Sequence, residues 1–108
     1  MNIDEFKNLG LRVGKIVAVE LVADSKKLLK FGVDIGENTP RQILSGVMGV
    51  YDPINLLGKN VIVAINIDSK IMAGVESCGM LIGVEQDQKG NPRLFFLDDD
   101  LPAGMVVS

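Results

Sequence analysis

Apolar and polar residues alternate along most of this chain, and a period of two residues is the pattern of β-strands. Between residues 11 and 21, apolar residues occupy most of the odd positions. Arg12 and Glu20 take the opposite side of the extended chain, and Lys15 alone breaks the alternation. We therefore predict one long strand over residues 11–21, with a bulge or kink at Gly14.

Four further strands are expected from the same kind of pattern. Residues 29–35 alternate cleanly, and the turn residues 36–40 join them to a strand over residues 41–47 as a hairpin. The wholly apolar run 61–65 predicts a strand that is buried on both faces. Residues 80–84 predict the fifth strand.

A short helical turn is expected between the third and fourth strands. Asp52 suits its N-cap, Pro53 its first helical position, and Gly58 its end. Five strands with one short helix in this place follow the order of the OB-fold, so the fold class is an all-β, five-stranded barrel. The apolar segments 94–97 and 105–107 then predict a short β extension at the C-terminus.

Composition narrows the possible chemistry. The 108 residues suit one domain, taken here to span residues 1–108. Histidine is absent and Cys78 is the single cysteine, which excludes an internal disulfide, most zinc sites and most serine or thiol triads. The run Asp98–Asp100 lacks ligand spacing and is interpreted as a solvated turn. We expect no catalytic residue, no metal and no cofactor.

The cysteine count and the hydropathy of the chain indicate the cellular compartment of the protein. A single cysteine fits the reducing cytoplasm, and the first ten residues include two acids and no apolar stretch typical of a secretory signal. No run of about 18 apolar residues occurs, so no membrane helix is expected. We therefore predict a cytoplasmic protein.

Charge is distributed unevenly along the chain. The formal net charge is −3, which by itself argues mildly against a nucleic-acid partner. Residues 1–70 carry nine Lys/Arg against eight Asp/Glu, whereas residues 71–108 carry two against six. A barrel of this kind could offer a cationic face to phosphates while its other side stays acidic.

Several sequence strings, in order over about a hundred residues, carry a resemblance: Ile3–Phe6, Leu11–Ile16, Lys27–Phe31, Val33–Gly36, Arg41–Val47, Tyr51–Pro53, Leu56–Lys59, Asn66 and Gly74–Leu81. Together they resemble the tRNA-binding domain family, which occurs free-standing or joined to methionyl-tRNA synthetase. The resemblance implies an OB-fold and a non-catalytic module that binds tRNA. It also implies a homodimer and an aminoacyl-tRNA synthetase as a partner.

Residues that suit RNA contact are cations for phosphates and small or apolar groups for bases. Arg12 and Lys30 take the outward parity of neighbouring strands, so we expect them on one surface. Aromatic residues are scarce, and Phe31 is expected in the core. The candidate RNA-binding residues are Arg12, Lys26, Lys27, Lys30, Arg41, Asn66, Lys70, Ser77, Gly79 and Met80.

Other interpretations stay open at this point. The lysines and arginines can be solubility charges, Gly79 a turn residue and Met80 part of the core. The apolar C-terminal segments either support a homodimer or cover the open side of the barrel. An acidic pI of about 4.8, with Ile71 and Ala73 where the resembling family has cations, also fits a protein–protein or chaperone-like module with weak or no RNA binding.

Overall fold

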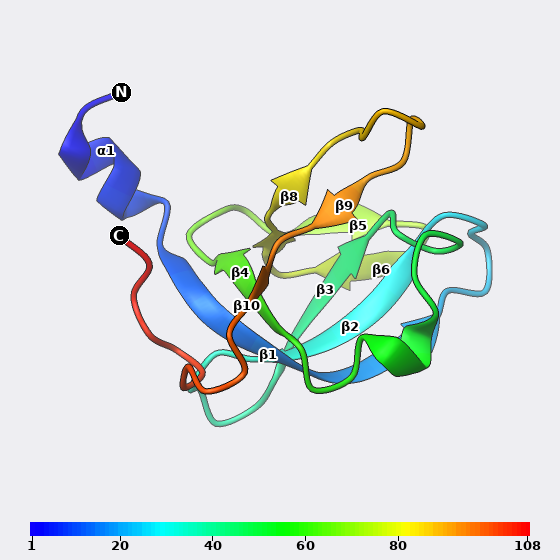
Figure 1. Cartoon of the computed structure of the whole chain (residues 1–108), viewed down its shortest axis with the longest axis horizontal. Helices are drawn as coiled ribbons and strands as arrows, with labels where there is room; N and C mark the ends of the chain where they lie inside the picture. Colours follow the sequence, from blue (N-terminus) through cyan, green and yellow to red (C-terminus); the bar gives the residue numbers. More distant parts are fainter.

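An antiparallel sheet curls into a nearly closed barrel in the computed structural model, which describes residues 1–108 (Figure 1). The strand order is β10-β4-β1-β2-β3. Strand β10 pairs with the first residues of β4, and β7 pairs with the last residues of β4 on the same side. These strands are β1 (Leu11–Leu21), β2 (Leu29–Asp34), β3 (Arg41–Ser45), β4 (Asn60–Ala64), β7 (Met80–Leu81) and β10 (Phe96–Leu97). The predicted all-β OB-fold is confirmed.

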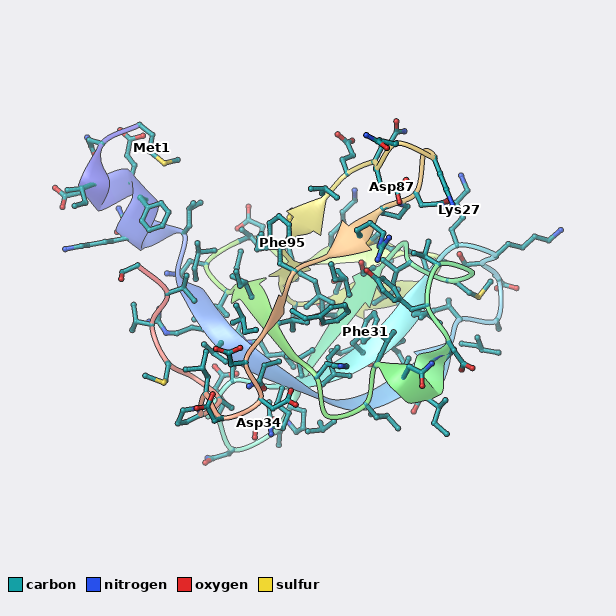
Figure 2. All side chains as sticks on the ribbon, in the orientation of Figure 1. Met1, Lys27, Phe31, Asp34, Asp87 and Phe95 are labelled. Carbon is teal, nitrogen blue, oxygen red and sulfur yellow. The ribbon has the colours of Figure 1, made fainter.

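The core follows from the alternation of side chains. In β2, Leu29, Phe31 and Val33 are buried while the residues between them are half-exposed. Phe31 lies among the strands in Figure 2, as the sequence predicted. The core cluster consists of Ile16, Leu29, Phe31, Val33, Ile35, Ile43, Val47, Leu56, Val61, Val63, Leu81 and Leu94.

Strand β1 bulges at Val17, not at Gly14. Ile16 pairs with Val33, but Ala18 pairs with Gly32, so Val17 has no partner in β2. A bulge adds one residue and inverts the parity of the strand beyond it. The even positions therefore face inward before the bulge and outward after it, which is why Lys15 seemed to break the alternation.

The fifth strand and the segment before it differ from the prediction. The fifth strand divides at Ile82 into β7 and β8 (Gly83–Val84), and β8 pairs with β9 (Arg93–Leu94) as a separate hairpin. The hairpin of β5 (Lys70–Met72) and β6 (Val75–Ser77) was not predicted. Its turn holds Ala73 at φ 50, a residue that seldom marks such a turn.

Short helices lie at two places. Between β3 and β4 the predicted turn is the 3-10 helix η1 (Pro53–Asn55), and the Asp52 carboxylate accepts a hydrogen bond from the backbone N–H of Ile54. Helix α1 (Ile3–Asn8) was not predicted, although Asn2 caps it by accepting from the N–H of Glu5 at 2.9 Å. No helix here has the length and apolar character to cross a membrane.

The C-terminal segment covers a free edge of β1. Gly104 N–H donates to the carbonyl of Val13, and Val107 N–H donates to that of Leu11. The predicted strand over residues 105–107 is only a single bridge, between Arg12 and Val106. The side chains of Met105 and Val106 nevertheless remain exposed. The backbone of this segment therefore covers the edge of β1, while its apolar side chains face the solvent.

Gly14 generates a prediction about stability. A Cβ atom at this position would lie 2.6 Å from Val33 Cγ1 and 2.7 Å from Val63 Cγ2, inside the packed barrel. We expect Gly14→Ala to lower the free energy of unfolding by roughly 1–3 kcal/mol because the core is overpacked. Gly46→Ala is the control, since a Cβ there would meet only the Lys27 carbonyl at 4.0 Å. Urea denaturation compares the two, and equal stabilities would contradict the packing.

Candidate nucleic-acid interface

The outer face of β2 and β3 brings several of the predicted residues near one another. Across the ladder, Glu20, Lys30 and Leu44 lie side by side, and paired residues project from the same face of a sheet. Leu44 in turn lines a groove of about 200 Å³ under the β5–β6 hairpin, together with Lys70 and Met80. Lys30 therefore lies next to a residue that lines the groove, Leu44.

The groove is apolar on its walls and charged at its rim. Met80 is half-exposed at 52%, and Ile67 and Met72 also line the groove. Lys70 is exposed and forms no ion pair, and Asp68 lines the same groove. A thioether surface beside a free ammonium group can accept a flat apolar ring and an adjoining anion. The sequence missed Ile67 and Met72 because it did not reveal the β5–β6 hairpin.

Ser77 and Gly79 shape this site from beneath. Ser77 is buried, accepts from the Leu44 N–H at 3.0 Å and donates to the carbonyl of Gly79 at 3.2 Å. Gly79 has φ 155, and a Cβ there would lie 3.0 Å from Ile43 Cδ1 and 3.2 Å from the Ala64 carbonyl oxygen, so a larger residue would be strained against the barrel. Both residues position Met80, and the Ser77 hydroxyl is fully engaged within the protein.

Two of the predicted cations are paired with carboxylates. Lys30 Nζ lies 2.9 Å from Glu20 Oε2 on the outer face of the sheet. Arg41 forms two hydrogen bonds to the carboxylate of Glu37, at 2.9 and 3.0 Å. These neighbours reduce the charge that either cation presents to a phosphate, although the Lys30–Glu20 pair is partly exposed to solvent.

Arg41 also closes one end of the barrel. It pairs with the inward-facing Val33, and its Nη1 donates to the carbonyls of Ile65 and Cys78, each at 3.1 Å. The hydrogen bond to Glu37 raises the pKa of Arg41. The guanidinium thus links β3 to the segments that follow β4 and precede β7.

Lys26 and Lys27 lie in the exposed turn between β1 and β2. Ser25 Oγ accepts from the N–H groups of Lys27 and Leu28, at 3.2 and 3.0 Å, which orders the turn. Neither lysine forms an ion pair. Figure 2 shows Lys27 at the periphery of the molecule, away from the core. These two charges are therefore available to an outside anion.

Arg12 and Asn66 lie elsewhere, and the expectation that Arg12 shares a surface with Lys30 is wrong. Arg12 pairs with the buried Val63, so it has inward parity because of the bulge at Val17. Its side chain lines a groove near the two chain termini. Asn66 Nδ2 donates to the carbonyl of Asn8 at 3.1 Å and so ties the loop after β4 to the end of α1.

The single thiol offers no nucleophile. Burial is the main cause that raises the pKa of Cys78, and the charge of Glu76 adds to it. A thiol with a raised pKa stays protonated near neutral pH and reacts slowly. No group of three or more Cys, Asp or Glu side chains is arranged to hold a metal ion.

A small OB-type barrel with cations beside an apolar groove has the architecture of an oligonucleotide-binding domain. The chain belongs to the tRNA-binding domain family: the family described as "Putative tRNA binding domain" matches residues 11–106. A methionine–tRNA ligase of Methanococcus maripaludis is 46% identical over 107 residues. The match covers 99% of this chain and 16% of that ligase.

Solved structures show the same relationship. A MetRS related protein from Pyrococcus horikoshii has a TM-score of 0.89 and 34% identity, covering all of this chain and 97% of that one. A chaperone CsaA of Bacillus anthracis has a TM-score of 0.85 and 25% identity, covering all of this chain and 98% of that one. The chain spans between 13% and 16% of the curated ligases first matched.

The Glu37–Arg41 pair generates a prediction about acid stability. The hydrogen bond from Arg41 lowers the pKa of Glu37 below its usual 4.5. The folded state therefore binds this proton less readily than the unfolded chain, so the stabilisation is complete above about pH 4.5 and is lost as the pH falls further. We expect Glu37→Gln to remove this part of the decline, as thermal unfolding between pH 3 and pH 7 would measure.

The control for this experiment is Glu20→Gln. It removes the same charge from an ion pair on the outer face of the sheet, where Lys30 has no bond to the barrel end. This variant should keep the acid-dependent loss that Glu37 causes. An identical pH response in the wild type and Glu37→Gln would show that the pair does not contribute.

Proposed function

We propose that this domain binds tRNA with the surface formed by the Lys26–Lys27 turn, the outer face of β2 and β3, and the Lys70–Met80 groove. The observation that carries the proposal is that Lys26, Lys27 and Lys70 have no carboxylate partner in a chain that is acidic as a whole. Lys30 contributes to this surface when a phosphate displaces the Glu20 carboxylate from its ammonium group. Arg41, Ser77 and Gly79 hold the surface in shape.

Recognition by this surface is mainly of backbone and shape. Lysines bind phosphates without regard to base identity, and Met80 offers an apolar contact that every base can use. The domain should therefore bind different tRNAs with similar affinity. Its role is to raise the local concentration of tRNA for an aminoacyl-tRNA synthetase, such as methionyl-tRNA synthetase, in the cytoplasm.

The lysine turn supplies the test of tRNA binding. We expect Lys26→Gln with Lys27→Gln to weaken tRNA binding and to reduce the slope of log affinity against log salt by about two, since each phosphate contact contributes about one. Filter binding over a salt series measures both quantities. Lys15→Gln with Lys89→Gln changes the net charge equally and should keep the wild-type slope. Equal slopes in the two double variants would refute the proposed surface.

The terminal region favours a homodimer as part of the proposal. Helix α1 projects from the barrel, both termini lie at the same end of the molecule in Figure 1, and no α1 residue is buried. Between α1 and the C-terminal segment runs a groove of about 360 Å³, lined by Ile3, Phe6 and Val106. A second copy that covered this apolar surface by two-fold symmetry would double the tRNA-binding area.

Val106 provides the test of the dimer. It is 68% exposed, and we expect Val106→Asp to shift the protein to monomers because a carboxylate would be buried at the contact. Leu21→Asp is the control, since Leu21 is 70% exposed at the far end of β1. Sedimentation equilibrium measures the mass. A wild-type monomer, or a dimer that survives Val106→Asp, would contradict this interface.

A chaperone-like or protein-binding role is the second candidate. It is favoured by the similarity to the CsaA chaperone fold and by the acidic average charge. In that case the apolar groove at Met80 would take an extended peptide in place of a base. Binding of a synthetase or of unfolded polypeptide without any binding of tRNA would support this role over the first.

A further inference from the structure

Phe96 and Lys59 form an exposed aromatic and cationic surface on the β10 edge of the barrel. Lys59 directly precedes β4, and β10 pairs with the beginning of β4 through Phe96 and Leu97. This register places Lys59 Nζ 5.8 Å from the centroid of the Phe96 ring, although the two residues are far apart in the sequence. The ring is 40% exposed, and Lys59 has no ion-pair partner.

The ring of Phe96 packs against Tyr51, which is itself held by hydrogen bonds. Tyr51 meets it in a T-shaped contact, with ring centroids 5.5 Å apart and ring planes at 82°. The Tyr51 hydroxyl accepts hydrogen bonds from Arg93 Nε at 3.0 Å and from the Leu94 N–H at 3.1 Å. The Arg93 guanidinium lies 5.5 Å from the centroid of the Tyr51 ring, and Asp87 lies 3.6 Å from Arg93. Phe96 is thus held in place.

Phe95 is a second exposed aromatic residue, and its surroundings differ from those of Phe96. It is 45% exposed, directly precedes Phe96 and has no aromatic or cationic partner. Exposure of apolar surface therefore does not explain the arrangement at Phe96. A fixed ring that is 40% exposed, with an ammonium group over it that no carboxylate pairs with, has the two elements that single-stranded nucleic acid requires, a stacking surface for a base and a cation for the next phosphate.

A hydrogen-bonded path joins this surface to the lysine turn. The loop that carries Tyr51 also carries Met48, whose N–H donates to the carbonyl of Lys27 at 3.0 Å. The Lys26–Lys27 turn and the loop that carries Tyr51 are therefore neighbours in the fold.

We propose that Phe96 stacks on an unpaired base of the bound RNA while Lys59 contacts the adjoining phosphate. The inference rests on the proposed function, because it presumes that the domain binds RNA. It adds a second contact, on the β10 edge, that is selective for single-stranded segments. The lysines of the proposed tRNA-binding surface do not by themselves distinguish single-stranded RNA from duplex RNA.

A tryptophan reporter tests the stacking directly, because the chain contains no tryptophan. Phe96→Trp should keep the stacking surface, and its fluorescence should be quenched to saturation by a six-nucleotide oligo(A) RNA. Phe95→Trp, at the neighbouring position, should remain unquenched by the same RNA. Equal quenching in the two variants, or binding of the RNA without quenching at position 96, would overturn the inference.

Affinity measurements provide the second test. Phe96→Leu keeps an apolar side chain and should weaken oligo(A) binding about tenfold, while binding of an RNA duplex without unpaired nucleotides stays unchanged. Lys59→Gln should reduce the salt slope by about one, and Lys59→Arg should restore it. Thermal unfolding verifies that each variant is folded. Equal losses for single-stranded and duplex RNA, or a loss of dimers in Phe96→Leu, would refute the stacking role.

The two proposals fail in different ways. If Lys26→Gln with Lys27→Gln weakens tRNA binding but Phe96→Trp is not quenched, the stacking site is wrong and the proposed function stands. If no variant and no wild-type protein binds any RNA, the proposed function fails and the stacking site fails with it.

Discussion

The hydrogen bonds between β3 and residues 76–79 are the constraint on which the rest of the structure depends. The Cys78 N–H donates to the carbonyl of Gln42 at 2.8 Å, and the Leu44 N–H donates to Ser77 Oγ. Arg41 adds its bond to the carbonyl of Cys78. Without these bonds β3 would be a free sheet edge with unpaired backbone groups. They close the barrel, and they also position Met80 and the hairpin above the groove.

Cations in this acidic chain have two different roles. Arg41 and Lys30 lie against carboxylates, and Arg41 is a structural link across the end of the barrel. Lys26, Lys27 and Lys70 lie at exposed positions and form no ion pair. A net charge of −3 therefore does not describe the field that a phosphate meets, because that field depends on which cations are already neutralised.

The proposed RNA-binding and dimer surfaces lie on different parts of one barrel. The lysine turn and the Met80 groove adjoin β2 and β3, the terminal groove adjoins the first residues of β1, and Phe96 lies on the opposite edge of the sheet beside β4. A dimer formed through the terminal groove would leave the other two surfaces open on both copies. A long, folded RNA could then contact more than one of them.

Most of the fold was contained in the sequence itself. Period-two alternation, the turn residues 36–40 and the cap at Asp52 depend only on neighbouring residues, so they predicted β1 to β4 and η1 nearly at their observed bounds. The order and spacing of the family-like strings likewise predicted the domain family. The absence of histidine by itself excludes most zinc sites and most serine or thiol triads.

Only the tertiary structure decided which side chains meet. The break in the alternation at Lys15 indicates a bulge or kink but not its position, and the bulge at Val17 turns Arg12 inward, away from Lys30. The sequence makes Ser77 a candidate RNA contact, whereas in the structure its hydroxyl is hydrogen-bonded within the barrel. Lys59 and Phe96 became neighbours only through the register of β4 and β10. Contacts between residues distant in sequence depend on how the sheet closes, and local patterns carry no information about that closure.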